Sequence, residues 1–279
     1  MRIVKTIAEA QSACARLRRE GRILGLVPTM GALHEGHLSL VRAARAASDV
    51  VVVSIFVNPT QFGPNEDFSK YPRTFETDCA MLEREGVDLI FAPTVDEMYP
   101  AGASTFVVVE GVSDRLDGAS RPGHFRGVTT VVSKLFHIIE PHKAFFGQKD
   151  AAQVAVLRKI VRDLNFPLKM VVCPIVREGD GLALSSRNRY LSETERGQAL
   201  VLNRALKAVG DAAASWEKSA QRLVEIARAV LAEEPDVRVD YISVVDPDTL
   251  EDVADVRGGA LVAVAALVGT TRLIDNILL

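Results

Sequence analysis

The 279-residue chain lacks the features that would place it in a membrane, on a secretion route or on a nucleic acid. Its longest apolar run, Ala260–Val268, is much shorter than the roughly 20 residues that a membrane-spanning helix needs. The first residues, Met1–Lys5, contain neither the apolar core nor the cleavage site of a secretory signal. The net charge of −3, from 33 basic and 36 acidic residues, lacks the basic excess of a nucleic-acid-binding protein. We therefore expect no membrane and no nucleic acid among its partners.

Cysteine is scarce, and the three cysteines have neither disulfide nor metal-motif spacing. Cys14, Cys79 and Cys173 lie far apart and form no CxxC pair. This usage is typical of buried, reduced thiols in a cytoplasmic protein. A hydrophobic fraction of 48% and a charged fraction of 25% exclude a disordered or collagen-like chain. At roughly 150 residues per domain, the length predicts one large domain or two ordinary ones.

Short apolar runs alternate with amphipathic stretches over the first two thirds of the chain. Strands are predicted at residues 23–27, 49–57, 87–92, 106–109, 144–146 and 168–173. Helices are predicted at residues 6–21, 36–47, 74–85, 128–139 and 150–164. The β-branched run Val50–Val53 is typical of a strand that is covered on both faces. We therefore expect an α/β domain with a doubly wound, Rossmann-like parallel sheet over residues 1–175.

The pattern changes after a boundary expected near residues 174–180. Ser192 and Glu195 have capping-box spacing, which predicts a helix to about residue 215, and a second helix follows to about residue 233. Three strand-like runs then cover residues 237–245, 261–267 and 272–278. We expect a smaller C-terminal α+β domain over residues 176–279 that closes over the functional site.

The segment Pro28–His37 (PTMGALHEGH) links the first of these strands to a helix. Ligands bind beyond the carboxyl ends of strands in open α/β sheets, and a helix N-terminus offers N–H groups to a phosphate. His34 and His37 share a face of the first turn, and Gly36 lets a nucleotide approach the backbone. The alternatives are two ordinary surface histidines, or a zinc pair that lacks HExxH spacing and an obvious third ligand. We favour nucleotide binding.

Four further blocks follow the HxGH segment in order: Asn58–Phe62 (NPTQF), Arg121–Val128 (RPGHFRGV), Phe146–Gln153 (FGQKDAAQ) and Asp180–Asn188 (DGLALSSRN). Together the blocks resemble the pantothenate synthetase, or pantoate–β-alanine ligase, family. That family belongs to the HxGH nucleotidyl-transfer group, which includes class I aminoacyl-tRNA synthetases. Leu184 stands where methionine is more usual, a change of similar volume. The C-terminal Arg272–Asn276 (RLIDN) also resembles the family.

The resemblance implies an ATP-dependent ligase that condenses (R)-pantoate with β-alanine to pantothenate through a pantoyl adenylate, with AMP and pyrophosphate as the other products. Mg²⁺ is expected to arrive with ATP, held mostly by phosphate and water, with no dedicated metal site in the protein. A homodimer is expected from the family. The implied ATP-binding residues are Met30, Gly31, Ala32, Leu33, His34, Glu35, Gly36, His37, Gly147, Gln148, Lys149, Asp150, Val176, Leu184, Ser185, Ser186 and Arg187.

The resemblance also implies catalytic roles for four of these residues, namely His34, His37, Lys149 and Arg187, with His37 as a proton donor. We favour positioning and charge stabilisation for both histidines, because a carboxylate is already ionised at neutral pH and needs no base. Lys149 and Arg187 are candidates for neutralising the departing pyrophosphate, since they bring a mobile point charge and a planar donor fork.

Gln61 and Gln153 are the implied substrate-binding residues. Both are implied to contact pantoate, and Gln61 to contact β-alanine later. A side-chain amide donates and accepts at once, which suits the two hydroxyls of pantoate. Phe62, with apolar residues around Pro28 and Val131, is a suggested packing surface for the gem-dimethyl group of pantoate.

Two other functions stay open at this point. A different HxGH small-molecule nucleotidyltransferase predicts a basic pocket in place of Gln61 and Gln153, and a non-catalytic nucleotide regulator predicts a broken site. A tRNA synthetase is disfavoured, because the chain is short, is not basic and has no evident anticodon-binding module. The segment Arg121–Val128 is either a mobile flap over the site or a structural turn.

Overall fold

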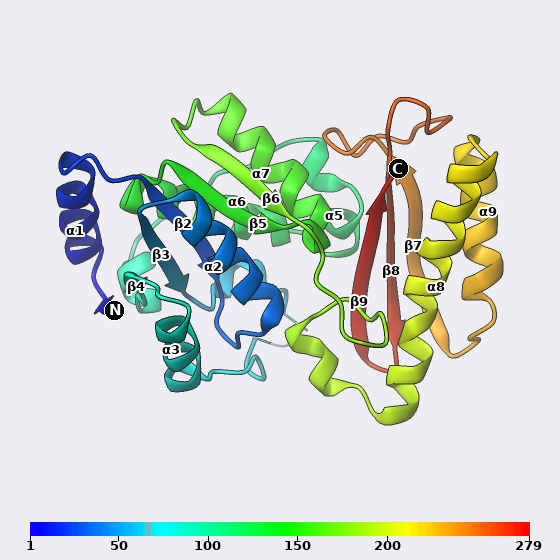
Figure 1. Ribbon diagram of the computed structural model, residues 1–279, viewed down its shortest axis with the longest axis horizontal. Helices are drawn as coiled ribbons and strands as arrows, with labels where there is room; N and C mark the ends of the chain where they lie inside the picture. Colours follow the sequence, from blue (N-terminus) through cyan, green and yellow to red (C-terminus); the bar gives the residue numbers. More distant parts are fainter. Residues whose placement is uncertain (65, 67) are drawn as a thin grey trace.

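The computed structural model describes residues 1–64, 66 and 68–279, which form two separate β-sheets (Figure 1). The larger sheet has six strands in the order β1-β4-β3-β2-β5-β6, with parallel pairing throughout. The smaller sheet has three antiparallel strands in the order β7-β8-β9. The strands are β1 Arg2–Val4, β2 Leu24–Thr29, β3 Val50–Ile55, β4 Leu89–Phe91, β5 Lys143–Gly147, β6 Lys169–Cys173, β7 Val237–Val245, β8 Leu261–Val268 and β9 Thr271–Leu278.

Helices connect the strands. The α-helices are α1 Ile7–Arg19, α2 Glu35–Ala47, α3 Phe75–Arg84, α4 Val95–Met98, α5 Asp117–Ser120, α6 His124–Ile139, α7 Ala151–Asp163, α8 Glu193–Ser215 and α9 Ala220–Leu231. Short 3₁₀-helices are η1 Pro59–Gln61, η2 Val112–Asp114, η3 Gln148–Asp150 and η4 Ser186–Tyr190. Among the described residues, we find no helix with the length and apolar character needed to cross a membrane.

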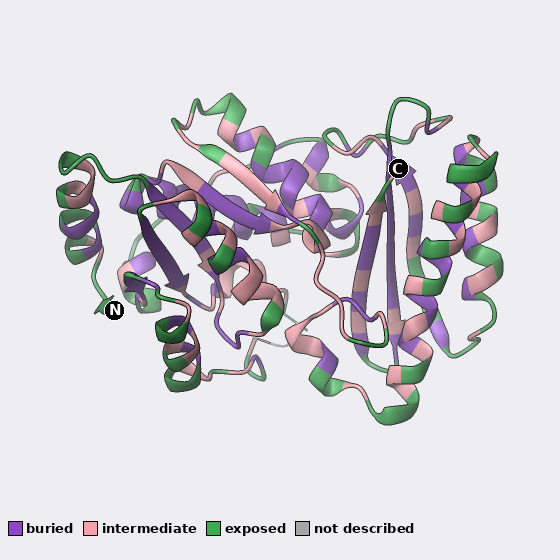
Figure 2. Cartoon of the chain, viewed as in Figure 1, coloured by how far each residue is buried: buried purple, intermediate pink, exposed green. Residues whose placement is uncertain are grey.

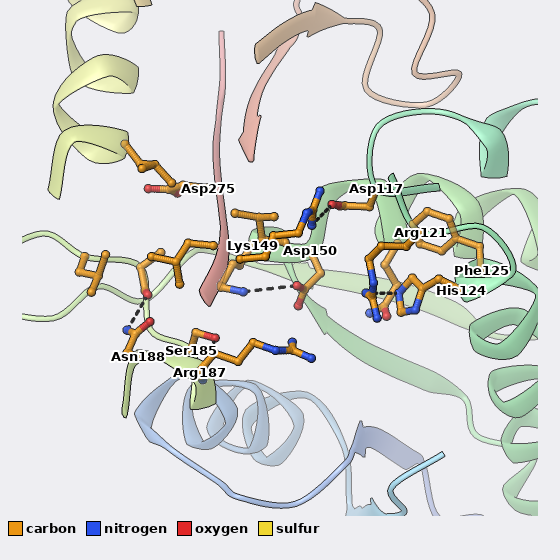
Figure 3. A pocket seen from close by; sticks show the side chains of 17 residues that line it. Asp117, Arg121, His124, Phe125, Lys149, Asp150, Ser185, Arg187, Asn188 and Asp275 are labelled. Carbon is orange, nitrogen blue, oxygen red and sulfur yellow. Dashed lines mark hydrogen bonds and ion pairs between the residues drawn. The ribbon is translucent and has the colours of Figure 1, made fainter. Parts of the chain in front are cut away.

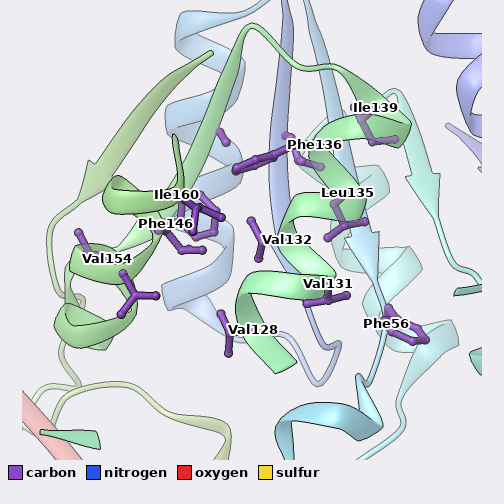
Figure 4. Packing of buried hydrophobic residues seen from close by; sticks show 14 of the residues in the cluster. Phe56, Val128, Val131, Val132, Leu135, Phe136, Ile139, Phe146, Val154 and Ile160 are labelled. Carbon is purple, nitrogen blue, oxygen red and sulfur yellow. The ribbon is translucent and has the colours of Figure 1, made fainter. Parts of the chain in front are cut away.

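Strand β3 shows why the larger sheet is covered on both faces. Val50 and Val52 pack into the core that also contains residues of α1, α6 and α7, whereas Val51 and Val53 pack into the core that contains residues of α2 and α3. Figure 4 shows the tight packing of α6 and α7 side chains in the first of these cores, and Figure 2 shows that buried residues follow the strands while the outer helix surfaces are exposed. The predicted doubly wound α/β domain is confirmed.

The strand order places a crevice at the carboxyl ends of β2 and β5. These two strands are paired neighbours, yet β2 continues through α2 to β3 on one side, and β5 continues through α7 to β6 on the other. Because the two connections diverge, the segments that leave β2 and β5 face each other across this crevice. The HxGH segment leaves from β2, and η3 leaves from β5.

The smaller sheet is sandwiched between its own helices and the larger domain. Side chains on β8 alternate, so that Val262 and Val264 pack into a core with α8 and α9. Leu261 and Ala263 face the opposite way and join the core of the larger sheet. The expected smaller C-terminal α+β unit is confirmed, whereas the exact division at residues 175 and 176 stays a prediction.

The strand predicted at residues 106–109 is wrong, since the structure assigns no strand there. The segment instead lies against α6, where the Val107 N–H donates to Thr130 Oγ1 over 3.0 Å and Thr129 Oγ1 donates to the Val107 carbonyl over 2.6 Å. Two buried hydroxyls thus take the place of a neighbouring strand. The sequence pattern also missed β1, and α6 begins at His124 rather than at residue 128.

All three cysteines are free, as expected. Cys14 and Cys173 are buried, whereas Cys79 of α3 is only half-buried and packs against the edge of the core.

Candidate active site

Three adjoining cavities meet around Asp150, which lines all of them. The first, which we call the histidine cavity, has a volume of about 180 Å³. It collects residues from five separate segments of the chain: the HxGH segment with the start of α2, the segment before α3 that contains Tyr71, the end of β5 with η3, the loop after β6, and η4 with the residues before it. Its lining includes Met30, His34, Gly36, His37, Gly147, Lys149, Val176, Leu184, Ser185, Ser186 and Arg187. Most of the predicted ATP-binding residues are therefore brought together.

The other predicted ATP-binding residues do not line the histidine cavity. Ala32 and Leu33 are buried, and Gly31 lines a different hollow. The exposed Glu35 forms an ion pair with Arg42. Gln148 turns its side chain toward β9.

The second cavity, which we call the glutamine cavity, has a volume of about 150 Å³ and shares Met30, His37, Tyr71 and Asp150 with the first. Gln61 and Gln153 both line it, as do Pro28 and Val131, among other apolar side chains. Phe62 does not line it, because its ring packs instead against Phe68 and Tyr71.

The third cavity, which we call the interdomain cavity, has a volume of about 90 Å³ and lies between the larger domain and β9 (Figure 3). Figure 3 shows Lys149 beside Asp150, and Arg121 beside His124, around this space. Arg187 reaches both this cavity and the histidine cavity.

Both HxGH histidines are held as neutral rings with their Nε2 atoms available. His34 is the N-cap of α2, where its Nδ1 accepts from the Gly36 N–H over 3.1 Å. His37 Nδ1 accepts from the His34 N–H over 3.4 Å, and the ring centroids are 4.2 Å apart. Because each Nδ1 is an acceptor, each Nε2 carries the hydrogen and can donate it to an oxyanion. A Cβ at Gly36 would lie 2.9 Å from the His34 ring, so this glycine makes room for the histidine, while its approach to a nucleotide stays a prediction.

Burial, together with nearby positive charge, disfavours protonation of these rings. Burial and the Lys149 ammonium lower the pKa of His34 to about 4. Burial and the adjacent His34 ring lower the pKa of His37 to about 3. Both imidazoles are therefore neutral at physiological pH, which favours hydrogen-bond donation over proton transfer.

A buried carboxylate that sequence reasoning missed fixes the segment before the histidines. Asp78 of α3 is 1% exposed, and its two oxygens accept from the Ala32 and Leu33 N–H groups, each over 2.9 Å. Gly31 and Ala32 have φ angles of 80° and 51°, so this turn is conformationally costly for Ala32. Asp78 holds the turn in this conformation.

Lys149 and Asp150 form an ion pair of 3.4 Å on η3. Burial opposes ionisation of Asp150, but the Lys149 ammonium outweighs it and holds the pKa of this carboxyl below its usual range. Lys149 lines both the histidine cavity and the interdomain cavity, so this ion pair lies where the two cavities meet.

The serine segment is tied to the HxGH segment. Ser186 Oγ donates to the Ala32 carbonyl over 3.2 Å, and Ser185 Oγ accepts from the Arg187 N–H over 3.2 Å. Val176 and Leu184 are joined by a backbone hydrogen bond of 3.0 Å, which explains how residues eight apart line the same cavity.

Asn58 orients Gln61, another role that sequence reasoning did not assign. Asn58 is 1% exposed, and its Nδ2 donates to Gln61 Oε1 over 2.9 Å and to the Gly127 carbonyl over 3.1 Å. Asn58 directly follows the second predicted strand, which is β3 in the structure, and this position at a strand end could have indicated a role in the site. The other end of the amide, Gln61 Nε2, lies 3.4 Å from Met30 Sδ.

The segment Arg121–Val128 lies against the backbone of Gln61. His124 Nδ1 donates to the Gln61 carbonyl over 2.8 Å, while its Nε2 accepts from Arg121 Nη1 over 3.0 Å. Arg121 also pairs with Glu66 over 2.6 Å. Burial and the Arg121 charge lower the pKa of His124 to about 4, so this ring is neutral too. These contacts favour a structural turn, and whether the segment moves stays a prediction.

We expect the three neutral histidines to make the fold acid-sensitive between pH 6.5 and 5. His34, His37 and His124 have pKa values of about 4, 3 and 4 when folded, against an ordinary value near 6.5 when unfolded. Below pH 6.5 the unfolded chain binds protons that the folded chain does not, so stability falls as pH falls. Each group contributes up to about 1.4 kcal/mol per pH unit well below pH 6.5. Denaturant unfolding at several pH values measures this slope.

The matched variant is His124→Gln, which removes one titrating group and keeps a hydrogen-bond donor. The variant should unfold with a shallower pH dependence over the same window. Unfolding free energies that stay constant from pH 7 to pH 5 in the parent chain would contradict the prediction.

Comparisons with known proteins agree with this architecture. A family model described as pantoate-beta-alanine ligase matches residues 2–278. A pantothenate synthetase from Koribacter versatilis is 65% identical over all of this chain and 96% of the relative, and one from Thermotoga neapolitana is 56% identical over the full length of both. The crystal structure of the Thermus thermophilus pantothenate synthetase covers 99% of both chains with a TM-score of 0.95 at 48% identity.

A further solved structure adds ligands to the comparison. The pantoate-beta-alanine ligase of Francisella tularensis, complexed with beta-gamma ATP and beta-alanine, has a TM-score of 0.80 at 35% identity and covers 100% of this chain and 97% of its own. The family model spans nearly the whole sequence, and these relatives match at full length. The chain therefore belongs to the pantoate–β-alanine ligase family, the ligases that join pantoate to β-alanine to form pantothenate.

Proposed function

We propose that the chain makes pantothenate in two steps, with MgATP in the histidine cavity and (R)-pantoate in the glutamine cavity. The observation that carries this proposal is that the two cavities share four lining residues, Met30, His37, Tyr71 and Asp150. A carboxylate in one cavity thus adjoins a phosphate in the other.

In the first step, a pantoate carboxylate oxygen attacks the α-phosphorus of ATP. The new P–O bond forms as the bond to the β-phosphate bridging oxygen breaks, and pyrophosphate leaves with that electron pair. The Nε2–H groups of His34 and His37 donate to phosphate oxygens, and the positive end of α2 faces the same charge. Lys149 and Arg187 neutralise the departing pyrophosphate. Mg²⁺ would arrive with ATP, held mostly by phosphate and water, and would neutralise part of the phosphate charge alongside Lys149 and Arg187.

Gln61 and Gln153 read the hydroxyls of pantoate, and the apolar wall that includes Pro28 and Val131 packs its gem-dimethyl group. Asn58 and His124 hold Gln61 from two sides, through its side chain and its carbonyl. This rigid arrangement supports discrimination against acids that lack the hydroxyls.

In the second step, the neutral amine of β-alanine attacks the carbonyl carbon of pantoyl adenylate. The C–N bond forms, the C–O bond to the phosphate breaks, AMP leaves with its electron pair, and the excess proton passes to solvent. The three cavities adjoin at Asp150, which supports retention of the adenylate until the amine arrives.

Three expectations accompany this proposal: a domain division between residues 175 and 176, a homodimer and a cytoplasmic location. The division is supported by the change from a parallel to an antiparallel sheet. The homodimer rests on the family resemblance, and the location on unpaired cysteines.

The test measures pyrophosphate and AMP release from MgATP, with (R)-pantoate alone and then with β-alanine. We expect a single burst of pantoate-dependent pyrophosphate, and turnover with AMP release only after β-alanine is added. ATP binding without pantoate dependence would contradict the proposal and favour another HxGH nucleotidyltransferase or a nucleotide sensor.

A further inference from the structure

A side chain of the smaller sheet holds the turn that carries Lys149. Asn276 lies on β9, is 2% exposed and reaches across the domain boundary to η3. Its Nδ2 donates to the Gln148 carbonyl over 3.0 Å and to the Lys149 carbonyl over 2.9 Å. Its Oδ1 accepts from Gln148 Nε2 over 3.1 Å. One amide therefore fixes two consecutive peptide groups and the side chain of Gln148.

This contact uses the full polarity of the asparagine amide. Both N–H bonds of Nδ2 point to carbonyl oxygens, and Oδ1 takes the donor offered by Gln148, so aspartate, leucine and alanine cannot reproduce it. Burial makes each of these hydrogen bonds expensive to lose, since the amide of Asn276 has little access to water.

The neighbouring residue on β9 holds a different segment. Asp275 forms a two-pronged ion pair with Arg177, at 2.6 and 2.9 Å, in the loop that leads to Leu184. The Asp275–Arg177 pair joins the smaller sheet to that loop, whereas Asn276 joins the smaller sheet to the η3 turn.

We propose that Asn276 is a positioning residue for the ligase reaction, which sets the Lys149 ammonium at the junction of the histidine and interdomain cavities. This inference rests on the proposed role of Lys149 at the phosphates. Without Asn276, the η3 turn relaxes and the ammonium shifts relative to the departing pyrophosphate. A displacement of about 1 Å at a reacting group is worth about 100-fold in rate.

The experiment is a double-mutant cycle of Asn276→Ala with Lys149→Ala, read as kcat and KM for ATP in pantoate-dependent pyrophosphate release. We expect Asn276→Ala to lower kcat by about 10- to 100-fold. In the Lys149→Ala background, the same change should cost less than about threefold further, because the group it positions is already gone.

Val268→Ala is the matched control, since it weakens the core of the smaller sheet without touching η3. It should lower the melting temperature and leave kcat unchanged. Asn276→Asp is a second variant of nearly the same shape. Its carboxylate keeps the oxygen that accepts from Gln148 Nε2, but places a second oxygen where Nδ2 donated to the carbonyls of Gln148 and Lys149. It should therefore lower kcat as Asn276→Ala does. Circular dichroism melts establish that each compared variant is folded.

If the fold-losses in kcat of the two single variants multiplied in the double variant, the proposal would be overturned, because Asn276 would then affect the reaction independently of Lys149. Wild-type kcat in Asn276→Ala, beside an impaired Lys149→Ala, would overturn this proposal alone. Wild-type kcat in Lys149→Ala would overturn both this proposal and the phosphate role of Lys149.

Discussion

The Lys149→Ala enzyme should lose about 10²- to 10³-fold in kcat for pantoate-dependent pyrophosphate release, the size of effect seen when one preorganised group at developing charge is removed. Lys149 is paired with Asp150 at the junction of the cavities, where negative charge accumulates on the departing pyrophosphate. The KM for pantoate should change little, because Lys149 does not line the glutamine cavity. Rapid-quench measurement of the first turnover isolates this step.

Lys159→Ala is the matched control, since that lysine forms an exposed i,i+4 ion pair with Asp163 on α7. It should retain parent activity. A Lys149→Ala enzyme that loses less than about tenfold would contradict the assigned role of Lys149 at the phosphates.

Replacing Gly127 by alanine should damage pantoate binding although alanine favours helices. A Cβ at this position in α6 would lie 2.3 Å from the Thr60 carbonyl oxygen and 2.6 Å from the Gln61 nitrogen. Both contacts are backbone atoms of η1, so the helix and the turn must separate. Overpacking of this kind costs about 1–3 kcal/mol, and it displaces Gln61 from the glutamine cavity. We expect the KM for pantoate to rise at least about tenfold, since each 1.4 kcal/mol is a factor of ten.

Gly197→Ala on α8 is the control, because a Cβ there meets nothing within 4 Å. It should stabilise the chain by about 0.5–1 kcal/mol through helix propensity alone. Denaturant melts and steady-state kinetics on both variants separate the two effects. An unchanged pantoate KM in Gly127→Ala would show that η1 adjusts without moving Gln61.

The sequence pattern predicted the fold class because strand and helix periodicities are local. The spacing of His34 and His37 likewise predicted a shared face of one turn, and their rings are in contact. Asp78 and Asn58 escaped prediction because their importance comes from which distant backbone groups they reach. Nothing in the residues around Asp78 indicates that its partners lie more than 40 positions away.

The strand error at residues 106–109 has a similar cause. A β-branched run predicts extended backbone. Only the tertiary structure decides which groups bond to the backbone N–H and C=O of such a run, and here they are the hydroxyls of Thr129 and Thr130 in place of a neighbouring strand.

The alternation of side chains on β8 has a thermodynamic consequence for the whole molecule. Leu261 and Ala263 contribute to the same apolar cluster as the larger sheet, while Val262 and Val264 serve the smaller one. If either unit unfolded alone, the apolar side chains that the other unit contributes to this cluster would be exposed to water. That exposure costs a free energy of roughly 25 cal/mol for each Å² of apolar surface. We therefore expect the two units to unfold together as one cooperative block.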